Sequence, residues 1–244
     1  MGYNNDIVKL NRQTKIIVTG ASHGIGRALS KELLARGTQV LGVSRSRGGQ
    51  EPGNFTFLSV DLEDSEGRAQ IVSWVKKNWR QFDILVNNAG VMYSEKVSES
   101  SLRKVREIME VNFFAPLELM IKLLPVFREG GIIINVLSPA VFRNHPQAGF
   151  YAASKAALRS VTGALRKEMG QVGTKKIKVL GYHPGFVKTE IFKEGKHPSF
   201  LAGLLQVAPE FTAKQIIKQM EKSKEGEYYE PVARIVKLAG MVEV

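Results

Sequence analysis

KIIVTGASHGIG, residues 15–26, decides the fold, because an apolar run passes directly into a turn that contains Gly20, Gly24 and Gly26. A helical pattern over residues 27–34 follows at once. Glycine permits a tight backbone path and leaves no side chain to hold a pyrophosphate away, while the start of a helix offers free N–H groups and a partial positive charge. Between a first strand and a first helix, this turn predicts a dinucleotide-binding site.

Short β-branched runs alternate with longer helical patterns along most of the chain. Strands are predicted at residues 16–18, 40–43, 55–60, 84–86, 132–136 and 177–180, and Tyr228 with Tyr229 is expected to start a last strand. Gly37 is expected to close the first helix, and Gly130 with Gly131 to separate a long central helix from the fifth strand. Apolar strands separated by helices indicate a parallel sheet covered on both faces. We therefore expect an α/β fold, a single-domain, doubly wound parallel sheet that is Rossmann-like.

The length of 244 residues fits one domain with a substantial core. Residues 1–12 are expected to form a flexible leader, and residues 13–244 a single dinucleotide-binding and catalytic domain. Glycine, proline and apolar residues are mixed near residues 190–209, which predicts either a substrate flap over a pocket or an irregular connection.

The composition, with 43% hydrophobic and 24% charged residues, is that of an ordinary globular protein. The chain has no cysteine, which excludes disulfides, thiolate catalysis and cysteine-ligated metal, and we predict no metal site. No stretch resembles a signal peptide or reaches the ~18 uninterrupted apolar residues of a membrane span. A cytoplasmic location is expected, because a chain without cysteine fits a reducing compartment.

Lysine and arginine outnumber aspartate and glutamate by 35 to 23, which gives a formal net charge of +12. Such a charge attracts phosphate-rich partners, but the basic residues are scattered, so no nucleic-acid partner is expected. The apolar tail, residues 232–244, carries Arg234 and Lys237 and resembles an amphipathic surface segment. We expect it to pack on the domain or on another subunit, and contact with lipid is the alternative.

Tyr151 and Lys155 lie four residues apart, and Ser138 lies thirteen residues upstream of Tyr151. On a helix, the spacing of four places the phenol and the ammonium on one face. A phenol titrates near about 10, and a neighbouring cation favours the phenolate, so the pair is a candidate acid–base unit. Taken alone, the pair also fits an ordinary surface contact. The dinucleotide turn earlier in the chain favours the catalytic interpretation.

The second predicted strand ends in the sequence Ser44-Arg45-Ser46-Arg47. In this region dinucleotide folds carry an acidic residue that binds the ribose hydroxyls of NAD, or an arginine that accommodates the additional phosphate of NADP. Two guanidinium groups beside two hydroxyls, with no carboxylate at the tip, predict NADP (NADPH) as the cofactor. The alternative is that Arg45 and Arg47 are ordinary surface arginines.

These motifs, together with Asp61, Asn87-Asn88-Ala89-Gly90 and Pro184-Gly185, resemble the short-chain dehydrogenase/reductase family over residues 15–189. The resemblance implies a catalytic tetrad of Asn112, Ser138, Tyr151 and Lys155. It also implies cofactor contacts from Gly20, Ser22, His23, Gly24, Ile25, Gly26, Ser44, Arg45, Asp61, Leu62, Asn88, Ala89, Gly90, Tyr151, Lys155, Pro184, Gly185, Val187 and Thr189. One departure is His23, where NADP-preferring relatives often carry a basic residue, so the preference for NADP depends mainly on Ser44 and Arg45.

The resemblance implies a role for each member of the tetrad. Tyr151 would give a proton to a carbonyl oxygen as a hydride arrives from the nicotinamide. Lys155 would lower the pKa of Tyr151 and hold the nicotinamide ribose, and Ser138 would position and polarise the carbonyl. Asn112 would anchor a water that relays protons. Plainer explanations stay open, namely a turn at Ser138, a buried amide at Asn112 and a helix cap at Asp61.

The expected function is an NADP-dependent oxidoreductase that acts as a carbonyl reductase or alcohol dehydrogenase. Its substrate is expected to be hydrophobic, because the predicted wall is mostly apolar: Met92, Tyr93, Ala140, Val141, Phe142, Phe150, Phe186 and the region near Phe192. His145 is interpreted as an exposed loop residue, and contact with the substrate is the alternative. The resemblance also implies a homodimer or homotetramer. The alternative function is a nucleotide-responsive binding or regulatory protein that keeps the fold without turnover, but the intact tetrad favours the enzyme.

Overall fold

The computed structural model describes residues 9–46, 53–171, 175–188, 191–194, 206–222 and 225–240. Seven strands form one sheet in the order β11-β7-β6-β4-β1-β2-β3, and every neighbouring pair is parallel. The strands are β1 (Lys15–Thr19), β2 (Gln39–Ser44), β3 (Phe55–Ser59), β4 (Phe82–Asn87), β6 (Phe127–Val136), β7 (Lys178–His183) and β11 (Gly226–Tyr229). The expected doubly wound parallel sheet is confirmed.

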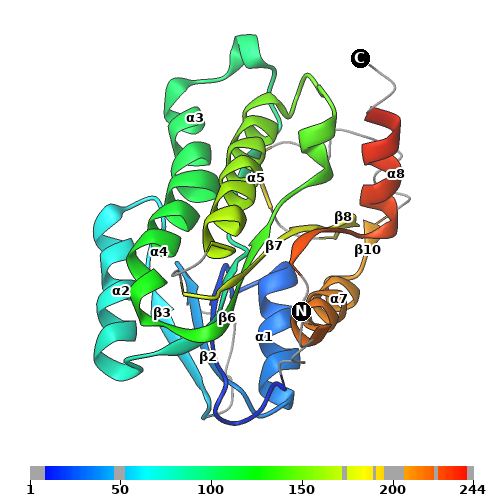
Figure 1. Cartoon of the computed structure of the whole chain (residues 1–244). Coiled ribbons are helices and arrows are strands. Elements are labelled where there is room, and N and C mark those ends of the chain that lie inside the picture. The colour runs from blue at the N-terminus through cyan, green and yellow to red at the C-terminus, as the bar shows by residue number, and fades with distance from the viewer. Residues whose placement is uncertain are drawn as a thin grey trace.

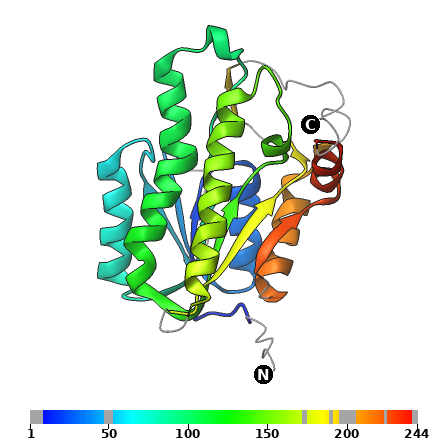
Figure 2. The same cartoon turned by 45° about the horizontal axis from the view of Figure 1, so that its top comes forward.

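Helices cover both faces of the sheet (Figures 1 and 2). One face carries α2 (Ser65–Asn78), α4 (Ala115–Leu123) and α5 (Gly149–Met169), and the other carries α1 (Gly24–Ala35) and α7 (Pro209–Lys222). Two apolar clusters form the core, one on each face. Within β1, Ile17 belongs to the first cluster while Ile16 and Val18 belong to the second, because successive side chains of a strand point to opposite faces.

Gly130 departs from the sequence-based expectation. The fifth strand was expected to follow Gly130 and Gly131, but β6 already begins at Phe127, so both glycines lie inside the strand. Gly130 has φ +76°, a conformation that glycine adopts without strain, and the pairing register with β4 shifts between Phe82 and Ile84. The pairing with β4 is therefore irregular at this point, but β6 continues through both glycines.

The long central helix is interrupted. It consists of α3 (Leu102–Met109), a π-helical turn (Glu110–Phe114) and α4. Pro116 has no N–H to donate to the carbonyl of Asn112, so the ordinary α-helical bond between these two residues is absent. Asn112 therefore lies in the widened turn, and such turns are frequent at functional sites.

Short strands hold both ends of the segment for which a flap was expected. β5 (Met92–Tyr93) pairs with β9 (Phe192–Glu194), and β8 (Phe186–Val187) pairs with β10 (Gln206–Val207). Residues 189–190 and 195–205 lie outside the described residues, so the flap stays a prediction. The leader falls mostly outside them too, because the description begins at residue 9.

The expected apolar tail forms a helix over most of its described part. This helix, α8 (Pro231–Gly240), buries Ala233 and Val236 and exposes Ile235 and Leu238. Among the described helices, none combines the length and apolar character needed to cross a membrane.

Two helical glycines give opposite predictions for substitution by alanine. A Cβ on Gly26 in α1 would lie 2.1 Å from the carbonyl oxygen of Gly20 and 2.6 Å from Asn88 Nδ2. Overpacking of this kind costs about 1–3 kcal/mol, so we expect Gly26→Ala to lower the free energy of unfolding by at least that amount. Urea unfolding measures it.

Gly163, in α5, is the matched control. A Cβ there would meet no atom of the described residues within 4 Å, apart from the helix's own nearby backbone. Alanine is favoured over glycine in a helix interior by about 0.5–1 kcal/mol, so Gly163→Ala should stabilise the protein. Equal effects of the two substitutions would contradict this account of the close approach at Gly26.

Candidate active site

A cavity of about 540 Å³ lies at the carboxyl ends of the strands. In a parallel sheet these ends meet at one edge, which is where α/β folds bind ligands. All of the residues predicted for the site line this cavity except Gly26, Asn112 and Thr189. Gly26 and Asn112 lie in the wall behind it, and Thr189 lies outside the described residues.

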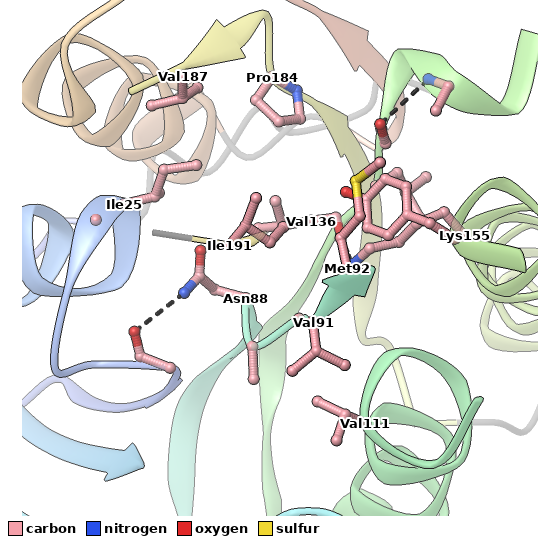
Figure 3. A pocket seen from close by; sticks show the side chains of 18 of the residues that line it. Ile25, Asn88, Val91, Met92, Val111, Val136, Lys155, Pro184, Val187 and Ile191 are labelled. Carbon is pink, nitrogen blue, oxygen red and sulfur yellow. Dashed lines mark hydrogen bonds between the residues drawn. The ribbon is translucent and has the colours of Figure 1, made fainter. Parts of the chain in front are cut away.

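The glycine turn forms one wall of the cavity. Gly20 and Gly24 have φ values of +68° and +51°, which a residue with a side chain rarely adopts, and Gly24 begins α1. Asn88 holds the turn, because its Nδ2 donates to the carbonyls of Thr19 at 2.9 Å and Gly20 at 3.3 Å. Figure 3 shows Asn88 directed toward this turn and Ile25 on the neighbouring wall. The N-terminus of α1 therefore faces the cavity, as an anion-binding turn requires.

The end of β2 carries the groups predicted to bind the additional phosphate. Arg45 and Ser44 both line the cavity, and Arg45 Nη1 lies 3.9 Å from Asp61 Oδ2 in a partly exposed pair. Such a pair contributes little to stability, so the guanidinium can exchange this partner for a phosphate. Arg47 lies outside the described residues.

The cap of α2 and the carboxylate that lines the cavity are two different residues, Asp64 and Asp61. The cap of α2 is Asp64, which accepts from the N–H of Glu66, and not Asp61. Asp61 Oδ1 accepts from the N–H of Glu63 at 3.0 Å. This bond orients a carboxylate that lines the cavity next to Leu62. The helix-cap explanation for Asp61 is therefore wrong.

Ser138, Tyr151 and Lys155 line the same cavity as Arg45, and β4 and β1 lie between the strand before Ser138 and the strand before Arg45. Ser138 follows β6 and caps the short 3₁₀ helix Pro139–Phe142, where its Oγ accepts from the N–H of Ala140 at 3.1 Å. The hydroxyl of Tyr151 is hydrogen-bonded to the Ser138 side chain. Lys155, one turn further along α5, donates from Nζ to the carbonyl of Val136 at 2.9 Å. These three polar side chains form a cluster on the wall of the cavity, and Figure 3 labels Lys155 among the residues that line it.

Burial sets the protonation of this cluster. Burial lowers the pKa of Lys155 to about 8 and raises the pKa of Tyr151, although the hydrogen bond from Ser138 acts in the opposite direction on Tyr151. The expectation that Lys155 lowers the pKa of Tyr151 does not describe this structure, because the ammonium points to the Val136 carbonyl. A phenol with a raised pKa is protonated at neutral pH, which is the form that donates a proton.

Asn112 is fully buried and uses its side chain within the protein. Its Oδ1 accepts from the N–H of Val91 at 2.8 Å, and its Nδ2 donates to the Val91 carbonyl and to Ser154 Oγ, each at 3.0 Å. Ser154 in turn donates to the carbonyl of Tyr151 at 2.7 Å. Asn112 therefore braces α5 against the chain after β4, as the buried-amide explanation expected. A role in proton relay stays a prediction.

The substrate wall was only partly predicted. Met92, Ala140 and Phe186 line the cavity, whereas Tyr93 bonds Glu107 and Phe150 packs in a separate apolar cluster. Phe142 packs against His183, and the side chain of Phe192 lies outside the described residues. The cavity as a whole is also lined by Val91, Val111, Val136, Leu137, Pro139, Arg143, His145, Ala148, Ile191 and Val236. No local pattern marks these residues, because they reach the cavity from elements far apart in the chain.

Comparisons with known proteins agree with this geometry. The family model described as short chain dehydrogenase matches residues 14–198. The NADPH-dependent 3-dehydrocapnine reductase of Ornithobacterium rhinotracheale is 31% identical over 194 residues, which cover 74% of this chain and 68% of that protein. The sorbitol-6-phosphate 2-dehydrogenase of Klebsiella pneumoniae is 29% identical over 201 residues, covering 77% and 74%. A short-chain dehydrogenase structure from Streptomyces avermitilis superposes with a TM-score of 0.82 at 26% identity, covering 94% of this chain and 92% of that one.

The lowered pKa of Lys155 predicts a pH dependence of stability. An unfolded lysine titrates near about 10.4, so between pH 8 and that value the unfolded chain binds more protons than the folded one, and stability rises with pH. Lowering the pH has the opposite effect, so the stability gained from the deprotonation of Lys155 is lost as the pH falls through 8.

Lys155→Met removes the titrating group. Between pH 8 and 9.5 we expect wild type to gain roughly 2 kcal/mol in unfolding free energy relative to this variant, measured by urea denaturation at a series of pH values. If the unfolding free energies of the two proteins changed with pH in parallel, burial of the Lys155 ammonium would not cost the fold free energy.

Proposed function

The chain belongs to the short-chain dehydrogenase/reductase family, and on that premise we propose that it is an NADP-dependent carbonyl reductase with a hydrophobic substrate, or an alcohol dehydrogenase in the reverse direction. Membership makes it an oxidoreductase that uses a nicotinamide cofactor. The proposal depends on one observation. The same cavity is lined by the glycine turn, by Arg45, by Ser138 with its partner Tyr151, and by Lys155.

The residues present fit a dinucleotide. Gly20 has φ +68°, and a Cβ there would lie 2.9 Å from Asn88 Nδ2, so this point of the turn requires glycine. Gly90 lies beside Lys155, where a Cβ would stand 3.6 Å from Nζ. We assign the pyrophosphate to the turn and the N-terminus of α1, and the nicotinamide end to Lys155 and the Pro184-Gly185 turn.

Each catalytic side chain then has a distinct task. When bound, the reduced nicotinamide supplies the hydride for the carbonyl carbon. Tyr151, protonated because burial raises its pKa, donates its proton to the carbonyl oxygen. Ser138 Oγ, already bonded to the same hydroxyl, holds the carbonyl oxygen within reach of Tyr151. Lys155, whose Nζ donates to the Val136 carbonyl at 2.9 Å, is assigned to the nicotinamide ribose and not to Tyr151.

Three features support the finer parts of the proposal. Arg45 and Ser44 at the end of β2 favour NADP over NAD, and the relative from Ornithobacterium rhinotracheale is named as NADPH-dependent. The substrate end of the cavity is mainly apolar, with Met92, Ile191 and Val236 among its lining residues. These side chains favour a hydrophobic carbonyl compound. A cytoplasmic location and a homodimer or homotetramer stay predictions from the sequence.

Tyr151→Phe tests the assignment of the proton donor. Loss of a general acid reduces rates by roughly 10²–10⁴-fold, so we expect kcat for NADPH consumption with a carbonyl panel to fall by that factor. The dissociation constant for NADPH, measured by fluorescence titration, should stay within about 3-fold of wild type, because the phenol is not the main cofactor contact.

Tyr228→Phe is the matched control, since Tyr228 packs with the core on the other face of the sheet and does not line the cavity. It should leave kcat unchanged. Turnover that survives Tyr151→Phe, or a wild-type protein that binds NADPH but reduces no member of the panel, would contradict the proposed function.

Arg45→Ala tests the cofactor preference. A hydrogen bond to a charged group contributes about 1.5–3 kcal/mol, so KM for NADPH should rise roughly 10–100-fold while KM for NADH changes little. Arg36→Ala, which removes a partly exposed arginine paired with Glu32 outside the cavity, controls for the loss of one positive charge. An equal effect of Arg45→Ala on both cofactors would refute a phosphate contact.

A further inference from the structure

His183 lies directly behind the catalytic cluster. It is the last residue of β7 and precedes the Pro184-Gly185 turn that lines the cavity. Its ring is 0% exposed and is not part of the cavity lining. The proposed chemistry gives this imidazole no role, so its contacts need another explanation.

Within the described part of the chain, the ring makes one hydrogen bond, and its partner is Ser138. His183 Nδ1 lies 3.1 Å from the carbonyl oxygen of Ser138, which is 45 residues away in the chain. A carbonyl oxygen can only accept, so the proton must be on Nδ1, and His183 donates. Among the described residues, Nε2 has no hydrogen-bond partner, and the nearest charged oxygen, Glu227 Oε2, is 3.7 Å away.

The ring is neutral in this environment. Burial lowers the pKa of His183 to about 4, and the charges of Arg159 and Lys237 act in the same direction. The bond to the Ser138 carbonyl and the charge of Glu227 act against this shift but are smaller effects. A neutral imidazole with its single proton on Nδ1 is a fixed donor across the physiological pH range.

Neighbouring side chains hold the ring in its orientation. Tyr229 of β11 stacks on it, with ring centres 4.3 Å apart and planes inclined by 14°, and Phe142 lies at 5.6 Å. Glu227 of β11 is bound by Arg159 of α5 at 2.7 and 3.1 Å. The main chain is tied as well, since Glu230 donates its N–H to the His183 carbonyl at 3.0 Å.

Ser138 needs such a contact, because it lies where the chain leaves the sheet. Leu137 makes the adjacent main-chain bond, from its N–H to the carbonyl of Tyr182 at 2.7 Å. Beyond it, Ser138 has extended dihedral angles, and its carbonyl points to His183. The direction of that peptide group determines where Oγ of Ser138 lies relative to Tyr151.

We propose that His183 is a positioning residue, which fixes the main chain of Ser138 from behind and thereby holds Ser138 Oγ in reach of the Tyr151 hydroxyl. The kinetic test of this inference rests on the proposed reductase function, whereas the test by amide hydrogen exchange does not. The inference also extends the active site to β11, because Tyr229 of that strand stacks on the imidazole and holds its orientation.

Two substitutions of His183 distinguish the effect of its hydrogen bond from the effect of its aromatic ring. His183→Phe keeps an aromatic ring for stacking on Tyr229 but has carbon in place of Nδ1. His183→Asn loses the ring but can place an amide N–H at the position of Nδ1. A displacement of about 1 Å can cost 10²-fold in rate, so we expect His183→Phe to reduce kcat roughly 10–100-fold with KM for NADPH within about 2-fold. His183→Asn should recover most of that loss.

A double-mutant cycle with Ser138→Ala tests whether the effect passes through the serine. If it does, His183→Phe costs less than about 2-fold in the Ser138→Ala background, because the group that it positions is gone. The same loss in both backgrounds would overturn the proposal and leave His183 with a purely structural role. Thermal unfolding of each variant identifies any that fails to fold.

Amide hydrogen exchange supplies a readout that needs no turnover. The N–H of Ala140 is bonded to Ser138 Oγ, so its exchange reports the position of that side chain. We expect faster exchange of Ala140 in His183→Phe than in wild type, and near wild-type exchange in His183→Asn. Unchanged exchange in His183→Phe refutes the inference even if the protein is an active reductase. Faster exchange supports it even if no substrate has been found.

Discussion

The bond from Lys155 Nζ to the carbonyl of Val136 joins the two elements that carry the candidate catalytic groups. Ser138 follows Val136 by two residues, and Tyr151 precedes Lys155 by one helical turn, so this contact between α5 and the end of β6 sets how closely the two hydroxyls approach. It also keeps an amine in a buried position, where its pKa is lowered to about 8. The apolar clusters on both faces of the sheet supply the stability that offsets this cost.

The last elements of the chain support the same site from behind. Glu230, at the end of β11, accepts hydrogen bonds from the Gly185 N–H at 2.9 Å and from the Tyr182 hydroxyl at 2.6 Å, so a buried carboxylate holds the turn that faces the cavity. Val236 of α8 lines the cavity itself. The C-terminal segment therefore takes part in forming the site, in addition to closing the sheet.

Much of this arrangement could be predicted from sequence patterns, and the failures have a common cause. Each predicted strand has an observed counterpart, since apolar runs between turn residues are local signals. The prediction at Gly130 failed because a glycine that ends one element has the same local appearance as a glycine inside an irregularly paired strand. Neither the direction of the Tyr151 pKa shift nor the full set of cavity-lining residues has a local signal, because both depend on neighbours from other elements.

The sequence by itself determined the class of fold, the position of the glycine turn and the identity of the candidate acid–base residues, because each depends on residue types at short, fixed spacing. The tertiary structure alone decided which of these groups are buried, which proton each one holds, and that the ring of His183 lies against the main chain of Ser138. The physical reason is that desolvation and hydrogen bonding act through space, between residues whose separation along the chain carries no information about their contact.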